Sequence, residues 1–335
     1  MNILAIIPAR SGSKSITNKN IRPFAGKPML AHSIEHAKQS SYINRIILST
    51  DSEEYAQIGR AYGAEVPFLR PEEYATDTAL DIEAFYHCLQ YLKEQEGYCA
   101  DIVVQLRPTY PIRDSKDIDA MIEILMNNCS YDSVRSIARA KEIPYKMWHK
   151  QSDGSITPIM KDGKECYNMP RQQLPEVYYQ NACIDVTRGE VITNRYSMSG
   201  DHIYGYEMKH NMDIDTEEEL RLAEEYIKIT SGSSRFVFDI DGVIANLVKD
   251  NDYTKASPNL PMIEAINRLY DLGNQIILLT ARGYTTGINW EEITKKQLKE
   301  WGLKFHELHF GKPNGDYYID DKMLPMDKVL EFIRM

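Results

Sequence analysis

A short loop after the first hydrophobic run combines several residue types that can bind a polyanion. Between Arg10 and Asn20 the sequence holds two further cations, Lys14 and Lys19, together with Gly12 and three serines. Backbone N–H groups, hydroxyls and positive side chains of one turn can all point at a single phosphate chain. The spacing does not match the G-x-x-x-x-G-K-[ST] loop, so that mechanism is excluded. The alternative is a solvated basic turn that follows a core strand.

Two D-x-D patterns place carboxylates in pairs, at Asp213 and Asp215 and again at Asp239 and Asp241. We expect a short strand at Asp213 to Asp215, which would put the two carboxylates on the same side, with Ile214 facing the core. Paired carboxylates repel each other unless a cation lies between them, and Mg²⁺ prefers such oxygen ligands together with substrate phosphates. For the first pair the alternative is that Asp215 caps the following helix while Asp213 is solvated.

The elements that position these residues alternate between strands and helices. Ile3 to Ile7, Arg45 to Thr50 and Asp101 to Leu106 read as buried strands. Helical patterns follow over Met29 to Lys38 and from Ser115. This order predicts a doubly wound α/β sheet, with ligand-binding loops at the carboxyl ends of its strands. The loops at 10–20, 50–51 and 107–113 should therefore meet, with Asp51 and Ser52 available to cap the second helix.

The length of 335 residues allows two separate cores. Helical periodicity stops after Ile229, and T-S-G-S-S at 230–234 reads as a flexible linker. We therefore expect domains at 1–229 and 235–335. From Tyr145 the pattern of the first domain becomes irregular, which suggests an inserted subdomain or a dimerisation arm.

The composition limits which partners and which cellular compartment we expect for this chain. A net charge of −10 argues against broad binding of nucleic acid or anionic membranes. The five cysteines are scattered and form no C-x-x-C pair, which indicates reduced thiols in the cytoplasm and no zinc site. The first apolar run is too short for a signal peptide, and no run approaches the ~18 apolar residues of a membrane span.

The segment I-I-P-A-R-S-G-S-K-S-I-T-N-K-N-I at 6–21 resembles the opening motif of the acylneuraminate cytidylyltransferases. Those enzymes use CTP to join an acidic sugar to CMP. Segments at 48–54, 70–77, 106–113 and 168–186 extend the resemblance, which implies a Rossmann-like nucleotidyltransferase domain. By this resemblance the nucleotide is bound by Arg10, Ser11, Gly12, Ser13, Lys14, Lys19, Asn20 and Asp77.

The same resemblance implies that Asp213 and Asp215 hold Mg²⁺ and that the acidic sugar meets Arg107, Arg171, Gln172 and Asn181. Ser15, Thr17, Tyr110, Ala182 and Asp185 depart from the family pattern. Arg107 stands where the sialic acid enzymes have Gln, and a guanidinium there favours a more anionic or differently shaped acceptor. The alternative for Arg107 is an arginine on the surface after a strand.

The second domain resembles the haloacid-dehalogenase (HAD) phosphatases. This resemblance implies a Rossmann-like fold that is smaller than that of the first domain. Four segments match in order: 235–244, 275–282, 311–313 and 317–321. The resemblance implies that Asp239 attacks phosphorus and that Asp241 protonates the leaving group and then activates water. Thr280 and Lys312 would hold the phosphoryl oxygens. Mg²⁺ would be held by Asp239, Asp241 and either Asp320 or Asp321.

Together these features predict a bifunctional enzyme. The first domain would activate a nonulosonic acid with CTP, and the second would remove phosphate from the phosphorylated precursor of that sugar. The spacing after Asp241 leaves no room for a large cap domain, and we expect a homo-oligomer, a dimer or tetramer. The alternatives are a phosphonate or another capsule acid as acceptor, a nucleotide-sugar glycosyltransferase, and a second domain that serves only assembly.

Overall fold

A computed structural model describes residues 1–161, 165–208, 212–313, 322–327 and 329–330. It divides into two compact units, Met1–Leu220 and Arg221–Met335. The division falls inside helix α6 (Glu217–Thr230), so most of that helix belongs to the second unit. Asp320 and Asp321, expected as metal ligands, lie outside the described residues. Among the described residues no helix has the length and apolar character needed to cross a membrane.

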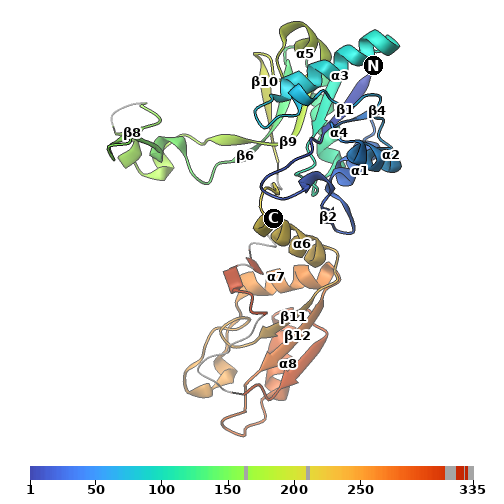
Figure 1. Cartoon of the computed structure of the whole chain (residues 1–335). Coiled ribbons are helices and arrows are strands. Elements are labelled where there is room, and N and C mark those ends of the chain that lie inside the picture. The colour runs from blue at the N-terminus through green and yellow to red at the C-terminus, as the bar shows by residue number, and fades with distance from the viewer. Residues whose placement is uncertain (162–164, 209–211, 314–321, 328, 331–335) are drawn as a thin grey trace. The chain divides into compact units, whose positions relative to one another are not determined.

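The first unit is built on a six-stranded sheet (Figure 1). In spatial order its strands are β10 (Ile203–Glu207), β6 (Ser133–Arg139), β9 (Tyr178–Arg188), β5 (Ile102–Leu106), β1 (Ile3–Pro8) and β4 (Arg45–Ser49). The pairs β4–β1, β1–β5 and β6–β10 are parallel, whereas β9 runs antiparallel to both neighbours. The sheet is therefore mixed, with a parallel majority.

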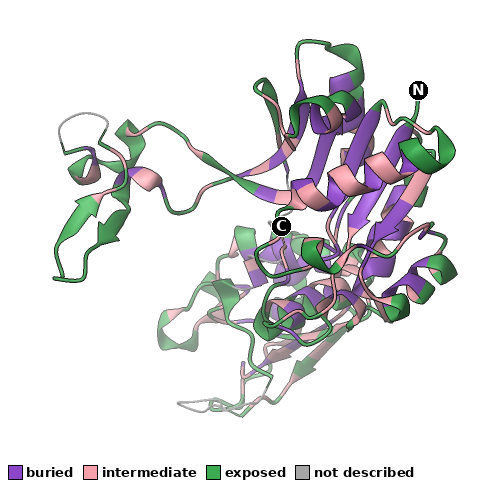
Figure 2. Ribbon diagram, turned by 45° about the horizontal axis from the view of Figure 1, so that its top comes forward, coloured by how far each residue is buried: buried purple, intermediate pink, exposed green. Residues whose placement is uncertain are grey.

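Helices cover both faces of this sheet, as the sequence predicted. Ile3, Ala5 and Ile7 of β1 pack with α1 (Met29–Gln39), α2 (Glu53–Tyr62) and α4 (Ser115–Asn127). The alternate residues Leu4 and Ile6 pack with α3 (Asp81–Glu96) and α5 (Gly189–Arg195) on the other face. Figure 2 shows the resulting buried central strands. An apolar run buried on both faces is typical of a central parallel strand.

Local signals define several helix ends. The Ser52 side chain caps α2 by accepting from the Tyr55 N–H, and Gly63 ends that helix at φ +99°. Asp51 does not cap it and instead contacts the loop after β1. Short elements complete the unit: η1 (Lys19–Ile21), β2 (Pro23–Phe24), β3 (Lys27–Pro28) and η2 (Glu72–Tyr74).

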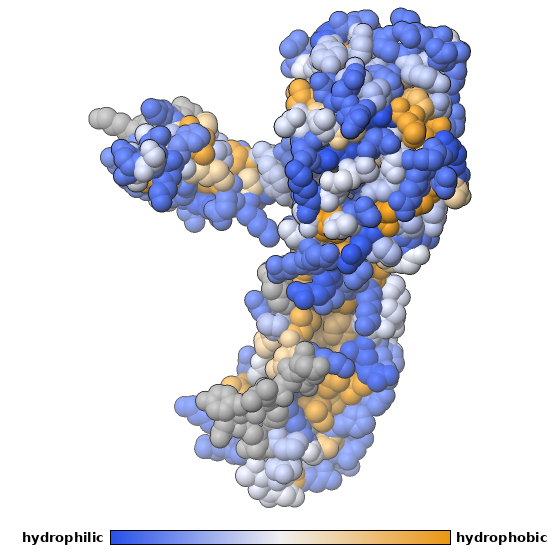
Figure 3. All heavy atoms as spheres, in the orientation of Figure 1, coloured by the Kyte–Doolittle hydropathy of each residue, from blue (hydrophilic) through white to orange (hydrophobic). Residues whose placement is uncertain are grey.

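The chain between β6 and β9 forms an arm that extends away from the sheet (Figure 1). It contains η3 (Pro144–Lys146), the hairpin β7 (Trp148–Lys150) and β8 (Ile156–Pro158), η4 (Cys166–Asn168) and η5 (Arg171–Gln173). Ile143, Tyr145 and Cys166 form a small core of its own. Figure 3 shows hydrophobic residues on the surface of this arm. Trp148 and Ile156 are among its exposed large side chains. The irregular sequence after Tyr145 is thus an inserted arm.

The second unit has a three-stranded parallel sheet in the order β11 (Arg235–Asp239), β12 (Gln275–Thr280), β13 (Glu307–Phe310). Its other elements are η6 (Lys249–Asn251), η7 (Tyr253–Lys255), α7 (Leu260–Asp271) and α8 (Glu291–Glu300). Phe238, Ile276 and Leu278 form its core with the apolar sides of α7 and α8. Ile229 of α6 joins this core. The described part of the unit is therefore an α/β fold with parallel strands.

Candidate functional site

The loop after β1 is anchored by side chains from two other places in the chain. Asp51 accepts from the Ser11 N–H at 2.8 Å and from the Ser11 hydroxyl at 2.5 Å. The Asn20 amide donates to the Arg10 carbonyl at 2.9 Å. The loops at 10–20 and 50–51 therefore meet at the carboxyl ends of β1 and β4, as predicted from their positions after parallel strands.

All three cations of this loop pair with aspartates. Arg10 lies 3.0 Å from Asp77, which also pairs with Lys14. These two cations lower the pKa of the Asp77 carboxyl, Lys14 most strongly. Lys19 Nζ lies 2.6 Å from Asp215. Arg10 and Lys14 thus share one carboxylate and Lys19 holds another, and a phosphate chain can replace such carboxylate partners.

Asp213 and Asp215 lie beside the loop that follows β5. The Ile214 N–H donates to the Thr109 carbonyl at 2.9 Å, and Ile214 is fully buried as predicted. Residues 212–215 form no regular strand, so the expectation of a short strand is wrong. Helix α6 is capped by Thr216, whose hydroxyl accepts from the Glu219 N–H, and not by Asp215. The helix-capping alternative for Asp215 is therefore wrong.

The surroundings of Asp213 fit a cation. Burial raises the pKa of its carboxyl, the charge of Asp215 adds to this, and Thr109 and Lys19 oppose it. Its Oδ1 is buried and has no hydrogen-bond partner among the described residues. No cluster of three or more His, Cys, Asp or Glu side chains occurs in the described ranges. Two carboxylates would need phosphate oxygens to complete the coordination of a magnesium ion, which is how that ion binds with nucleotides.

Asn181 and Arg107 lie on neighbouring parts of the sheet. Asn181 is buried in β9, where its Oδ1 accepts from the Ser136 hydroxyl at 2.5 Å and from the Cys183 N–H at 3.2 Å. Arg107, directly after β5, donates to Asp81 at 2.6 Å. Its Nε is buried, while 35% of the side chain is exposed, so Arg107 is a half-buried arginine at the end of the strand.

Ala182 has a left-handed backbone, with φ of +58°. It lies where the register of β6 against β9 shifts between Arg135 and Ile137, which is a β-bulge. Such a conformation costs an alanine about 1–2 kcal/mol relative to the right-handed region, whereas glycine adopts it freely. The bulge therefore retains a glycine-like backbone although its residue is alanine.

Arg171 and Gln172 lie on the arm, in η5. The Arg171 guanidinium donates to the Lys141 carbonyl and lies 3.6 Å from Glu142. Both partners belong to the chain between β6 and η3, outside the sheet. Within one chain the structure therefore does not bring Arg171 and Gln172 to Arg107 and Asn181.

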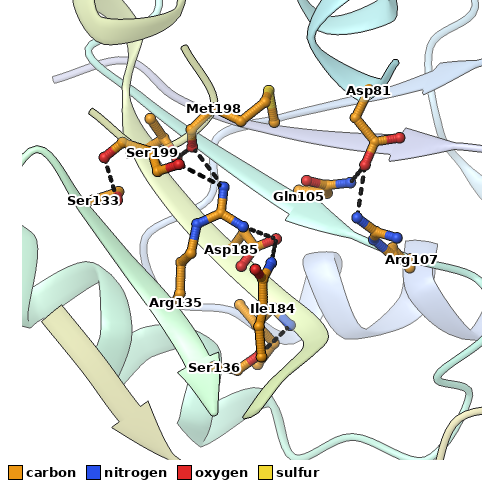
Figure 4. A network of polar contacts seen from close by, with 12 residues as sticks. Asp81, Gln105, Arg107, Ser133, Arg135, Ser136, Ile184, Asp185, Met198 and Ser199 are labelled. Atoms are coloured by element: carbon orange, nitrogen blue, oxygen red, sulfur yellow. Dashed lines mark hydrogen bonds and ion pairs between the residues drawn. The ribbon is translucent and has the colours of Figure 1, made fainter. Parts of the chain in front are cut away.

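A row of polar residues beneath Arg107 was missed at the sequence level (Figure 4). Asp185 of β9 is the register partner of both Gln105 in β5 and Arg135 in β6. Gln105 donates to Asp81 at 3.0 Å, and Arg135 lies 3.4 Å from Asp185. The available signal was the presence of charged residues inside otherwise apolar strand sequences.

In the second unit the predicted catalytic residues meet at the carboxyl ends of the strands. Lys312 Nζ donates to Asp239 at 2.5 Å, and the other Asp239 oxygen accepts from the Ile240 N–H at 2.8 Å. The Lys312 N–H donates to the Thr280 carbonyl at 3.1 Å. The parallel pairing of β11 with β12 and of β12 with β13 produces this convergence.

Asp241 is held by an arginine that sequence reasoning did not single out. Arg282 is fully buried and donates to both Asp241 oxygens at 2.7–3.1 Å. Its other nitrogen donates to Thr294 and Gln297, and the Tyr253 ring lies 4.6 Å from the guanidinium carbon. The only signal was an arginine two residues after Thr280 in T-A-R.

Known proteins resemble this chain over the first unit and beyond. A family model described as cytidylyltransferase matches residues 4–231. The CMP-N,N'-diacetyllegionaminic acid synthase of Legionella pneumophila is 34% identical, covering 68% of this chain and 97% of the relative. An N-acylneuraminate cytidylyltransferase of Escherichia coli is 29% identical over 99% of this chain and 79% of its own length. A CMP:2-keto-3-deoxy-manno-octonic acid synthetase complexed with CTP shares the fold, with a TM-score of 0.52, 16% identity and coverage of 68% and 98%.

Proposed function

This chain belongs to the cytidylyltransferase family, and we propose that its first unit activates a sialic-acid-like sugar with CTP. The products would be the CMP-sugar and pyrophosphate. The observation that carries the proposal is the basic loop after β1, in which Arg10 and Lys14 share Asp77 while Lys19 pairs with Asp215 of the acidic pair. The names of the Legionella and E. coli relatives both specify transfer of CMP to such acids, which supports this acceptor class.

In this mechanism the acceptor hydroxyl attacks the α-phosphate of CTP and displaces pyrophosphate. Arg10 and Lys14 exchange Asp77 for phosphate oxygens, and the turn from Ser11 to Ser13 directs N–H and hydroxyl groups at them, with Asn20 fixing its backbone. A magnesium ion held by Asp213 and Asp215 would supply positive charge to the phosphates. Lys19, whose ammonium lies 2.6 Å from Asp215, would orient that carboxylate toward the magnesium ion. The contribution of the chain is therefore positioning and electrostatic stabilisation.

The acceptor acid is proposed to meet Arg107 and Asn181 at the carboxyl end of β5. Asp81 compensates the charge of Arg107 at 2.6 Å, which weakens the case for a more anionic acceptor such as a phosphonate. Arg171 and Gln172 remain candidates for the sugar carboxylate, although they lie on the arm of this chain. Assembly as a dimer or tetramer also remains a prediction.

A panel of acids tests the first activity. The chain is incubated with CTP, Mg²⁺ and each acid while pyrophosphate release is measured. We expect turnover with nonulosonic acids. Lys19→Met should lose most of this turnover, because Lys19 pairs with Asp215. The control Lys38→Met should keep the wild-type turnover, because its ammonium donates to the Tyr62 carbonyl, away from the basic loop. Turnover with phosphonates alone would favour the alternative acceptor. UDP or GDP release from nucleotide sugars would indicate a glycosyltransferase.

For the second unit we propose a magnesium-dependent phosphatase of the HAD type that acts on the phosphorylated precursor of the same sugar. Asp239, placed 2.5 Å from Lys312, would attack phosphorus to form an aspartyl-phosphate. Thr280 and Lys312 would hold the phosphoryl oxygens, and Asp241 would handle the proton of the leaving alkoxide and then of water. The convergence of these residues at one sheet edge supports the proposal.

Phosphate release from the sugar phosphate tests this activity. Asp239→Asn removes the nucleophile and should lower phosphate release by at least about 10³-fold while cytidylyl transfer is unchanged. Asp271→Asn, which breaks a surface pair with Lys304 at 2.7 Å, is the matched control. If Asp239→Asn left every activity unchanged and truncation after Ser233 altered only oligomeric size, the unit would serve assembly.

A further inference from the structure

The polar row of Figure 4 crosses three strands at the edge where the nucleotide loop begins. Gln105, Asp185 and Arg135 are register neighbours on β5, β9 and β6, and Gln105 is also the partner of Ile6 in β1. Strand β1 ends two residues after Ile6, where the basic loop starts. The row therefore lies beside the site proposed for CTP, where an acceptor has to be held.

The row is buried but incompletely paired. Asp185 is 98% buried, and two donors reach its Oδ2 at long distances, Arg135 at 3.4 Å and the Gln180 amide at 3.5 Å. Within the described residues the Oδ1 of Asp185, the Nε of Arg107 and the Nε of Arg135 are buried without hydrogen-bond partners. Buried polar atoms are normally paired, so several unpaired atoms in one place indicate a missing partner.

A second aspartate of the same chain shows that a buried carboxylate need not be left incompletely paired. Asp132 is also buried, and its Oδ2 accepts from Arg195, from the Asp201 N–H and from the His202 N–H at 2.9–3.1 Å. That carboxylate is satisfied by the fold alone. Asp185 is more deeply buried, with 1% of its side chain exposed against 11% for Asp132, yet it has weaker partners, so its role is not explained by the packing of the sheet.

The unpaired atoms define the chemistry of the occupant. Asp185 offers an acceptor that needs a donor, whereas Arg107 offers a donor that needs an acceptor. The row is electrically balanced, because Arg107 pairs with Asp81 and Arg135 with Asp185. A carboxylate would find no excess positive charge and would meet the anionic Asp185. A neutral group with both a donor and an acceptor fits.

We propose that Asp185 and Arg107 bind a neutral substituent of the acceptor acid that both donates and accepts hydrogen bonds, an acylamino group being the simplest. Its N–H donates to Asp185 Oδ1 and its carbonyl accepts from Arg107 Nε–H. This inference rests on the proposed transfer of CMP to an acid. It assigns Asp185 and Arg107 the role of selecting the substituent, and it leaves the sugar carboxylate to other cations.

The test compares two acceptor acids that differ only in having an acylamino group or a hydrogen at one carbon. Wild-type kcat/KM should favour the acylamino acid by at least about tenfold, since the hydrogen analogue leaves Asp185 unpaired. Asp185→Asn keeps the volume, but its single oxygen faces Arg135 and its NH₂ meets the N–H of the substituent. We expect a loss of roughly 10- to 100-fold for the acylamino acid and little change for the analogue.

Arg107→Lys provides a second variant that keeps the charge opposite Asp81 but removes the Nε–H donor. Arg107→Lys should reduce the ratio of kcat/KM between the acylamino acid and its hydrogen analogue. This variant keeps the test available if Asp185→Asn does not fold, which a thermal unfolding measurement would show. Asp132→Asn is the control, with the preference unchanged. If both variants lower kcat/KM equally for the two acids, or not at all, the row is only structural and the inference is wrong. Absence of turnover of any acid by the wild type would instead overturn the proposed function itself.

Discussion

Asp51 provides a test of how the basic loop is organised, because both of its carboxylate oxygens accept hydrogen bonds from Ser11 of this loop. Its two oxygens accept from the Ser11 N–H at 2.8 Å and from the Ser11 hydroxyl at 2.5 Å. Asp51→Ala removes both bonds at once. The Ser11 N–H, which belongs to the turn proposed to face the triphosphate, then loses its fixed direction.

The size of the effect follows from these contacts. A hydrogen bond to a charged group contributes about 1.5–3 kcal/mol, and we count one such bond because the exposed hydroxyl can bind water instead. Since 1.36 kcal/mol corresponds to a factor of ten, the KM for CTP should rise roughly 10- to 150-fold. The change in kcat should be much smaller, because Asp51 acts on ordering of the loop before the reaction.

Steady-state kinetics with varied CTP measures this effect, and the chain offers a matched control. Asp119 makes the same kind of contact elsewhere, accepting from the Ser40 hydroxyl at 2.5 Å and from the Ser41 N–H at 3.0 Å. Asp119→Ala should leave the KM for CTP unchanged. A folded Asp51→Ala protein with the wild-type KM, or an equal rise in both variants, would refute the reasoning.

Three further predictions concern stability. Burial lowers the pKa of His36 to about 3, so below pH 6.5 the unfolded chain takes up a proton that the folded chain does not. The free energy of unfolding should therefore fall by up to about 1.4 kcal/mol per pH unit as the pH drops from 6.5 to 3. His36→Gln should flatten this slope, whereas the control His202→Gln, at an exposed site, should not. Arg282→Met leaves the half-buried Asp241 without its buried partner and should destabilise the second unit by about 1–3 kcal/mol in urea unfolding. A value near zero would contradict the role of the pair. Ala182→Gly relieves the left-handed alanine at the cost of chain entropy, so the first unit should gain up to about 1 kcal/mol in the same experiment, and a loss would show that the bulge is not strained.

The strands and loops of the first unit were predictable because hydrophobic runs and their order carry that information. Ile3 to Ile7 is buried on both faces as expected, and the loop after it meets Asp51. The direction of β9 was not predictable, since a period of two residues is the same for parallel and antiparallel strands. Capping of α6 by Asp215 was the alternative to metal binding, and it is Thr216 that caps the helix; the sequence could not separate the two, because both residue types favour that position.

Long-range pairs of side chains were the part that sequence reasoning missed. Asp241 and Arg282 are 41 residues apart, and Arg135 and Asp185 are 50 residues apart. Such pairs depend on strand register and on helix placement, neither of which a motif specifies. The motif residues Asp239, Thr280 and Lys312 were named from the resemblance to the HAD phosphatases. They lie together because each ends or closely follows a strand, and parallel strands bring their carboxyl ends together.

A structure determined with CTP and Mg²⁺ tests the central claim most directly. The account predicts that the triphosphate lies in the loop from Arg10 to Asn20, in contact with Lys14 and Lys19, with the metal between the phosphates and Asp213 and Asp215. A nucleotide bound elsewhere, with this loop still paired to Asp77, would contradict it.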